Sequence, residues 1–140
     1  YKASIDGGTP VRLVEISAED AQFSPDGKWI AYTSYLQEQD RLQRSLVVIP
    51  SEGGKPVHAF PHPVGFGLRW APEGNALTYY REVAGVSNLW SQPLDGGPPT
   101  QITDFRDGVI SSYDWSADGK RLYLSRGSET RDVVLIRDFR

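Results

Sequence analysis

The chain repeats itself at an interval of about 45 residues, and this repetition limits the folds open to it more than any other feature. The repeated unit places an aromatic residue, a Gly-containing turn and an alternating apolar stretch in the same order, at residues 23–32, 70–79 and 115–124. Successive units are 47 and 45 residues apart. An interval of this length with turns inside it matches a four-stranded propeller blade, whereas helical and leucine-rich repeats take roughly 20 to 34 residues.

The turns inside the repeat have a recognisable chemistry. Residues 24–27 read Ser-Pro-Asp-Gly, in which the proline presets φ, the aspartate caps the turn and the glycine takes the positive φ of a tight hairpin. After this turn, Ile30 and Tyr32 alternate with Ala31, a period of two that gives a strand one apolar face. A second turn, an acidic residue followed by Gly-Gly, recurs at residues 5–8, 51–54 and 94–97. Strands are therefore expected on both sides of each turn.

These signals predict an all-β chain of about three blade-equivalents, each a four-stranded antiparallel sheet, that forms a partial propeller or an oligomerising half-ring. Third strands are expected at 46–49, 89–92 and 133–136, and fourth strands at 11–14, 57–60 and 100–103. Residues 1–14 would supply the third and fourth strands of one blade, 15–60 and 61–103 two whole blades, and 104–140 a blade without its fourth strand. The polar stretch 36–42 is interpreted as a long loop.

Composition excludes several classes of partner. The 15 basic and 18 acidic residues are spread along the chain and give a net charge of −3, so no basic stripe is available for nucleic acid. No apolar run approaches the roughly 18 to 20 residues needed to cross a bilayer, so this segment is not expected to insert into a membrane. The absence of cysteine rules out disulfides, thiolate metal sites and a cysteine nucleophile.

No catalytic residue, metal ligand or cofactor site is predicted, and the chain is expected not to be an enzyme by itself. His58 and His62 are four residues apart, but Pro61 and Pro63 forbid the helix on which that spacing would align two ligands. The sequence contains no Gly-x-Ser-x-Gly segment of the kind that serine hydrolases place on an elbow. The Gly-Gly pairs lead into proline and a further strand, unlike phosphate-binding loops, which lead into a helix.

Binding is the function that the topology favours. In a meandering blade, connections of varied length and polarity gather on one face, and recognition residues commonly lie there. These connections are predicted at 35–44, 81–87 and 126–131 within blades and at 15–20, 61–66 and 104–108 between them. Arg81 and Arg126 hold equivalent positions at the start of that face, and Gln22, Arg69 and Asp114 precede the aromatic residue of each innermost strand, facing the channel. The alternative is that these are solvated polar positions.

The turn units and the Asp-Gly-Gly units together resemble the TolB-like (WD-repeat-like) propeller repeat over essentially all 140 residues. Ala117 in place of the turn proline and Glu73 in place of the aspartate depart from the repeat, but both units keep the glycine. Residues 89–97 and 131–140 are similar to the C-terminal part of propellers attached to bacterial serine/threonine kinases or winged-helix regulators. The resemblance implies a sensory or scaffolding module of a larger bacterial signalling or envelope protein, extracytoplasmic, that binds a protein, peptide or ligand.

Two alternatives stay open. Similar blades form the non-catalytic gating propeller of prolyl-oligopeptidase-like serine peptidases, which would continue into an α/β-hydrolase domain. A lyase with a metal in the channel would need clustered ligands on innermost strands, where only Asp114 is available. The first residue is Tyr1, so the chain is expected to be a segment of a longer protein. Open blade edges at both ends predict self-association, or aggregation of the isolated segment.

Overall fold

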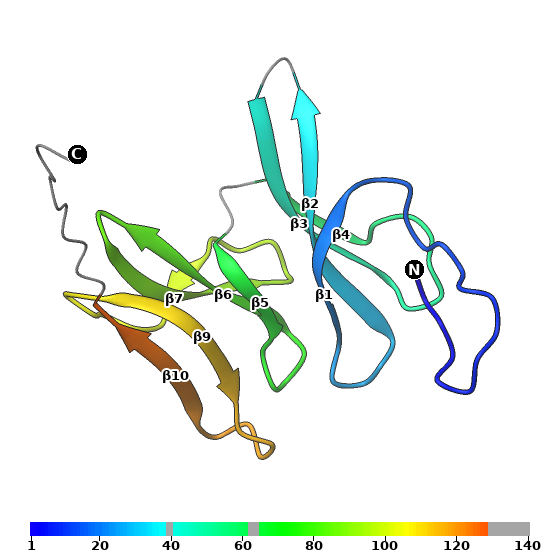
Figure 1. The fold of residues 1–140 in the computed structure, drawn as a ribbon. Coiled ribbons are helices and arrows are strands. Elements are labelled where there is room, and N and C mark those ends of the chain that lie inside the picture. Colours follow the sequence, from blue (N-terminus) through cyan, green and yellow to red (C-terminus); the bar gives the residue numbers. More distant parts are fainter. Residues whose placement is uncertain (39–40, 62–64, 129–140) are drawn as a thin grey trace, which may run out of the picture.

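A computed structural model describes residues 1–38, 41–61 and 65–128, and shows strands and turns but no helix in these residues. Blade 1 consists of β1 (Ala18–Phe23), β2 (Trp29–Glu38), β3 (Arg41–Pro50) and β4 (His58–Pro61). Blade 2 consists of β5 (Phe66–Trp70), β6 (Ala76–Val83), β7 (Val86–Pro93) and β8 (Thr100–Gln101), and blade 3 of β9 (Val109–Trp115) and β10 (Leu122–Gly127). Each sheet is an antiparallel meander in chain order (Figure 1), which confirms the predicted all-β blades.

The turn between the first two strands of each blade has one backbone pattern. In blade 1 the amide of Gly27 donates to the carbonyl of Ser24 at 2.9 Å, and the turns at Gly74 and Gly119 repeat this bond at 2.9 and 2.8 Å. All three glycines have a φ between 68° and 72°, the conformation for which glycine was expected. The turn therefore keeps its shape where Ala117 and Glu73 depart from the repeat, because the backbone bonds and the glycine are retained.

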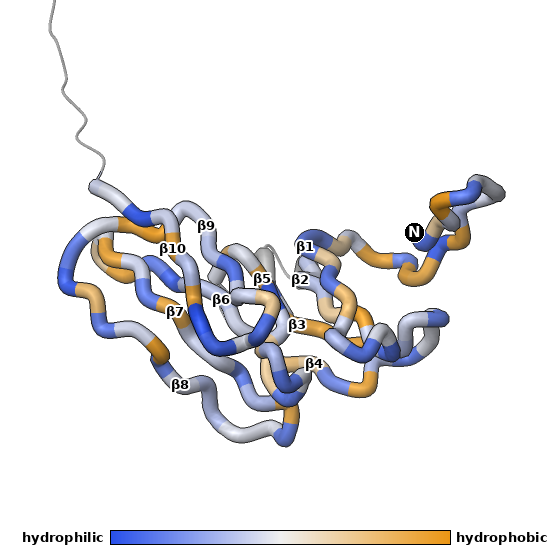
Figure 2. Tube along the Cα trace, turned by 90° about the horizontal axis from the view of Figure 1, so that it is seen from below, coloured by the Kyte–Doolittle hydropathy of each residue, from blue (hydrophilic) through white to orange (hydrophobic). Residues whose placement is uncertain are grey.

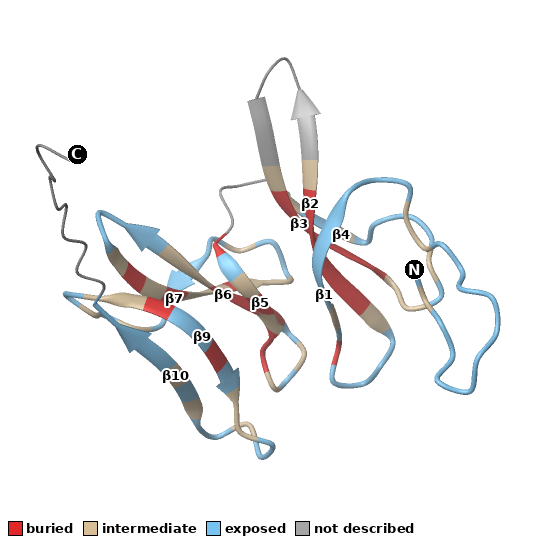
Figure 3. Ribbon diagram, viewed as in Figure 1, coloured by how far each residue is buried: buried red, intermediate tan, exposed pale blue. Residues whose placement is uncertain are grey.

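Each blade has two faces, and one face of each blade packs against the opposite face of the next blade. We call the face that carries Ile30, Leu77 and Leu122 the leading face, and the face that carries Ala31, Thr78 and Tyr123 the trailing face. The trailing face of blade 1 and the leading face of blade 2 share one core, formed by Ala31, Leu46, Val48, Leu68, Trp70, Leu77 and Tyr79. Figure 3 shows this buried layer running through β2, β3, β5 and β6.

The joint between blades 2 and 3 repeats this arrangement with more polar groups. The Tyr113 hydroxyl and the Trp115 indole nitrogen both donate to Thr78 Oγ1, at 2.9 and 3.4 Å. Burial raises the pKa of the Tyr113 hydroxyl, which therefore stays protonated and remains a donor. Leu89 and Ile110 are also buried. Two successive joints thus use equivalent strands in the same orientation.

Two predicted loops are largely replaced by paired strands in the described residues. The polar stretch 36–42 was expected as a loop, but β2 and β3 stay paired as far as Glu38 and Arg41. Polar residues are compatible with this because the ladder is made by backbone groups. The connection expected at 81–87 shrinks to Ala84 and Gly85, both with positive φ, which is the geometry of a two-residue hairpin turn. The connections between β2 and β3 and between β6 and β7 are therefore shorter than expected.

The predicted outer strands are also reduced. Residues 1–5 and 11–14 were expected as a third and a fourth strand, but they are joined only by an isolated bridge between Lys2 and Val11. The predicted fourth strand at 100–103 shortens to β8, because Thr103 uses its side-chain oxygen to accept the Leu89 amide at 2.9 Å. The third strand predicted at 133–136 lies outside the described residues. No helix long and apolar enough to span a membrane occurs in the described residues.

Candidate binding site on the innermost strands

The first strands of the three blades lie side by side at one edge of the row of blades, so that β5 contacts both β1 and β9. Gln22, Arg69 and Asp114 occupy equivalent positions on these three strands, each directly before the aromatic residue of its unit. They line a single hollow of about 300 Å³. Its other walls are aromatic, proline and small residues: Phe23, Pro25, Trp70, Pro72, Trp115, Ser116 and Ala117. The structure thus gathers three of the five predicted binding residues at one place.

Charge in the hollow is carried by one loose ion pair. Arg69 Nε lies 3.9 Å from Asp114 Oδ1, and the two side chains are 35% and 76% exposed. Arg69 Nη1 also donates to the Leu68 carbonyl at 2.9 Å, and Asp114 Oδ1 accepts the Trp115 amide at 2.8 Å. A solvent-exposed pair of this kind contributes little to stability. Its side chains are oriented by backbone contacts and keep hydrogen-bonding capacity for a ligand.

The aromatic walls are fixed by contacts between blades. Trp70 Nε1 donates to the Gln22 carbonyl at 3.0 Å, and the Trp70 side chain is buried in the shared core. Trp115 is held through Thr78 of blade 2. Gly119, in the turn after Trp115, lies so close to Pro72 that an added Cβ would be 2.6 Å from the proline Cβ. These contacts set the positions of the walls before any ligand binds.

The two arginines predicted on the face of varied connections each contact residues of their own blade or of the connection that leads into it. Arg81 lies in β6, where its guanidinium carbon is 4.9 Å from the centre of the Trp90 ring. Arg126 lies in β10, bonds to the side chain of Asp107 at 2.9 Å and to its carbonyl, and is 3.9 Å from the Phe105 ring centre.

Arg44 is a residue that the sequence prediction missed. Its guanidinium carbon lies 4.9 Å from the ring centre of Tyr35 in β2 and 4.8 Å from that of Phe66 in β5. Arg44 therefore links blade 1 to blade 2 by contacting one aromatic ring in each. The stretch 35–44 had been assigned to a loop, so the hairpin register that pairs Arg44 with Tyr35 was not anticipated.

Metal ligation finds no support among the described residues, where no group of three or more His, Asp or Glu side chains comes together. His58 lies in β4, and its ring stacks on Phe60 at 6.0 Å between ring centres. His62 lies outside the described residues.

Two known proteins resemble the chain in sequence. No family model matches the chain. It is 25% identical over 130 residues to the uncharacterized protein Atu1656 of Agrobacterium fabrum, a match that covers 89% of this chain and 43% of that protein. It is 25% identical over 136 residues to the uncharacterized peptidase YuxL of Bacillus subtilis, covering 96% of this chain and 19% of that protein. The chain thus spans less than half the length of either relative.

A solved structure shares the architecture. The β-propeller domain of the Trilobed protease from Pyrococcus furiosus, described as having an open velcro topology, superposes with a TM-score of 0.57. The match covers 78% of this chain and 34% of the protease chain, at 17% sequence identity. The structural match and the antiparallel four-stranded sheets together define the class of the chain. It is a segment of β-propeller.

Proposed function

We propose that the chain is a non-catalytic, TolB-like propeller module that binds an extended peptide in the hollow between Gln22, Arg69 and Asp114. The observation that supports this function is the convergence of three polar side chains, from equivalent positions of three blades, beside Trp70 and Trp115. Binding sites commonly combine an apolar lining with a few polar groups that fix orientation. The module would serve the sensory or scaffolding part of a larger bacterial signalling or envelope protein.

The chemistry of the hollow suits a peptide backbone. Arg69 donates hydrogen bonds, Asp114 accepts them and Gln22 does both, so the carbonyl and amide groups of an extended chain would all find partners. The exposed ring of Phe23 and the half-buried ring of Trp115, with Pro25 and Pro72, form the kind of aromatic surface on which proline-containing peptides dock. Arg69 favours a peptide with an acidic side chain near the site.

The lining residues do not provide a nucleophile with a base. Ser116 is the serine of the hollow, and its hydroxyl donates to Asp118 within the turn. Among the described residues no histidine lines the hollow, and Asp114 is paired with Arg69. Acyl transfer needs a nucleophile within hydrogen-bond reach of an oriented base, so the geometry favours binding over hydrolysis.

Titration of the chain with an acidic, proline-containing decapeptide, followed by tryptophan fluorescence and calorimetry, tests the proposal. Saturable binding is expected, with an affinity loss of about fivefold or more in Arg69→Ala, as for loss of a charge-assisted hydrogen bond. Arg106→Ala removes the same charge from the connection before β9, outside the hollow, and should leave the affinity unchanged. Equal losses in both variants, or no binding of the decapeptide, would refute the site.

A second candidate is the gating propeller of a serine peptidase. The peptidase named among the relatives and the protease named among the structures favour it. The sequence that flanks this segment in its gene discriminates between the two candidates. A following α/β-hydrolase domain with a Gly-x-Ser-x-Gly elbow would support the peptidase. A kinase or winged-helix domain would support signalling.

A further inference from the structure

The two tryptophans at the joints between blades are bonded in different ways. β5 lies between β1 and β9 in the row of blades (Figure 2), so blade 2 forms one joint with blade 1 and another with blade 3. At the first joint, Trp70 Nε1 donates directly to the Gln22 carbonyl at 3.0 Å. At the second, Trp115 Nε1 donates at 3.4 Å to Thr78 Oγ1, which donates at 3.4 Å to the Arg69 carbonyl. Because Arg69 is the equivalent of Gln22, the Thr78 hydroxyl takes the place of the direct bond.

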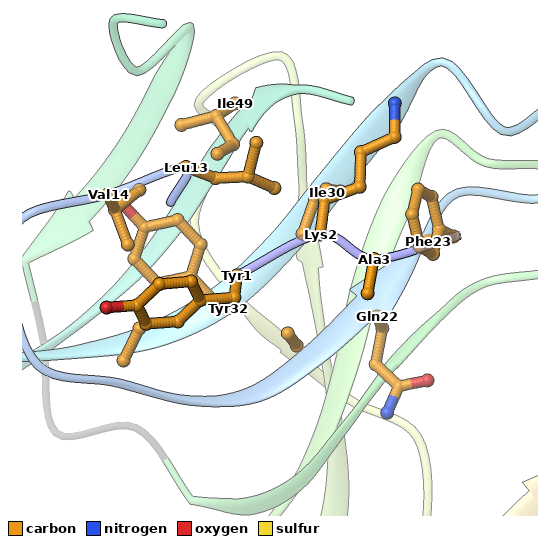
Figure 4. A pocket seen from close by; sticks show the side chains of 12 residues that line it. Tyr1, Lys2, Ala3, Leu13, Val14, Gln22, Phe23, Ile30, Tyr32 and Ile49 are labelled. Atoms are coloured by element: carbon orange, nitrogen blue, oxygen red, sulfur yellow. The ribbon is translucent and has the colours of Figure 1, made fainter. Parts of the chain in front are cut away.

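The difference follows from the residue that each tryptophan meets on the blade before it. Trp70 shares its core with Ala31, which has no polar side-chain atom to bond to an indole. Thr78 is the equivalent of Ala31 in blade 2 and is only 1% exposed. Phe23, the third member of the aromatic set, lies beside the N-terminal segment (Figure 4) and has no indole nitrogen to donate. Of the two joints with a tryptophan, the second is therefore the one with a hydroxyl between indole and carbonyl.

Thr78 uses its whole hydrogen-bonding capacity at this joint. A threonine hydroxyl donates one hydrogen bond and accepts two. The Tyr113 hydroxyl, at 2.9 Å, and the Trp115 indole fill the two acceptor positions. The proton of Thr78 is thereby left for the Arg69 carbonyl. One buried side chain thus contacts the ring of Trp115 and the backbone of Arg69 together.

These two residues are walls of the candidate binding hollow, whereas Thr78 lies behind them and is not among the lining residues. Trp115 is half-buried, but Trp70 is only 6% exposed. Pro72 lines the hollow beside them. The part of the hollow that belongs to the second joint therefore offers a ligand an accessible indole ring, which the first joint does not.

We propose that Thr78 is a positioning residue that holds Trp115 off the Arg69 backbone, so that a proline ring of the bound peptide can stack on Trp115. This assignment rests on the proposed peptide-binding function and names the group that this part of the hollow recognises. A direct bond of the kind made by Trp70 would draw the indole onto the Arg69 carbonyl and narrow the hollow. Proline rings dock on aromatic surfaces, and the walls of a binding site must be held by the residues behind them.

Thr78→Val tests the role of the hydroxyl, because valine keeps the shape of threonine and removes its hydrogen bonds. Calorimetry measures the affinity for the acidic, proline-containing decapeptide and for the same decapeptide with alanine in place of proline. Thr78→Val is expected to lose about fivefold in affinity for the proline peptide and less than about twofold for the alanine peptide. Thr78→Ser keeps the hydroxyl and should bind both peptides as the unmodified chain does.

Tyr113→Phe is the matched control for stability. It removes a hydrogen bond from the same buried hydroxyl but leaves the contacts of Thr78 with Trp115 and Arg69. If Thr78 acted on stability alone, both variants would lose affinity in proportion to their loss in urea unfolding. We expect Tyr113→Phe to keep the preference for the proline peptide. Should Thr78→Val not fold, the double variant with Tyr113→Phe replaces it, because no tyrosine hydroxyl is then left without a partner.

Exchange of the Trp115 indole proton with solvent, measured by NMR without peptide, tests the positioning by itself. The exchange should slow in Thr78→Val, because the indole then bonds directly to the Arg69 carbonyl; an unchanged or faster rate would refute the positioning. If exchange slows and Arg69→Ala weakens binding, but Thr78→Val keeps the preference for proline, the proline subsite is wrong and the proposed function stands. No binding of either peptide by the unmodified chain would overturn the proposed function and the subsite with it.

Discussion

The indole nitrogen of Trp70 donates a 3.0 Å hydrogen bond to the backbone carbonyl of Gln22, across the boundary between blades 1 and 2. The acceptor lies on the innermost strand of blade 1 and directly precedes Phe23, the equivalent of Trp70. One side chain therefore joins the shared core of the two blades to the wall of the candidate binding hollow. Stability of the joint and geometry of the site are expected to change together when Trp70 is altered.

Replacing Trp70 by Phe is expected to destabilise the chain by about 1–3 kcal/mol, because the part-buried Gln22 carbonyl loses its donor. Trp115→Phe is the matched control. Its bond to Thr78 Oγ1 is longer, at 3.4 Å, and Thr78 keeps the Tyr113 hydroxyl as a partner. We expect the loss in Trp115→Phe to be under about 1 kcal/mol. Urea unfolding measures both, and equal losses would contradict the role given to the Gln22 bond.

Alanine substitutions at Gly119 and Gly27 distinguish the cost of backbone strain from the cost of a clash between blades. Both have positive φ, so alanine at either position should cost about 1–2 kcal/mol in backbone strain. At Gly27 no atom lies within 4 Å of an added Cβ, whereas at Gly119 the Cβ of Pro72 would be 2.6 Å away. Gly119→Ala should therefore destabilise by about 1–3 kcal/mol more than Gly27→Ala in urea unfolding. The excess should disappear in the background Pro72→Gly; if it persists there, the contact is not its cause.

The blades could be predicted from the sequence because their signals are local. The glycines of the turn units need positive φ whatever surrounds them, and the apolar run Ile30, Ala31 and Tyr32 marks β2 as a strand. The single apolar face expected for this strand was wrong, because Ala31 is buried in the core shared with blade 2 while Ile30 and Tyr32 are buried in a cluster on the other face. Hairpin length could not be predicted in the same way. Backbone pairing between β2 and β3 continues through polar residues as far as Glu38 and Arg41, so composition does not mark where the ladder stops.

The candidate site was predictable only in its repeated part. Gln22, Arg69 and Asp114 share one position in the repeat, and equivalent positions on neighbouring blades come together in space. Arg81 and Arg126 also share a position in the repeat, but the partners described for them, Trp90 and Asp107, come from different parts of their units, so the repeat did not predict these contacts. Contacts that depend on residues outside the repeat are not visible in its pattern.

The turns of blades 1 and 3 should make stability depend on pH. A hydrogen bond from the Ser24 hydroxyl, with a further one from the Lys28 amide, lowers the pKa of Asp26 below its ordinary value of 3.8. Ser116 and Lys120 lower the pKa of Asp118 in the same way. Because the folded state favours the charged carboxylates, their contribution is present above the ordinary pKa and is lost as pH falls through the folded one. The urea midpoint should therefore fall as pH is lowered below about 4.

Substituting the serines that bond to Asp26 and Asp118 shows how much each carboxyl group contributes to the pH effect. Ser24→Ala should raise the pKa of Asp26, followed by NMR titration of its carboxyl, and should leave Asp118 unchanged. Ser116→Ala should do the reverse. A shift of both carboxyl groups in either variant would show that the turns are coupled, which their separate hydrogen-bond networks do not predict.

Arg44 should contribute more to stability than its place on a polar hairpin indicates. Its guanidinium lies within 5 Å of the ring centres of Tyr35 and Phe66, one in each of two blades, whereas Arg81 contacts the single ring of Trp90. At about 0.5–1 kcal/mol for each partly exposed cation–π contact, Arg44→Ala should destabilise by about 1–2 kcal/mol and Arg81→Ala by about half as much. Arg44→Lys keeps the charge but loses the planar stacking, so an intermediate loss is expected in urea unfolding. If Arg44→Ala costs no more than Arg81→Ala, the contact with Phe66 does not hold the two blades together.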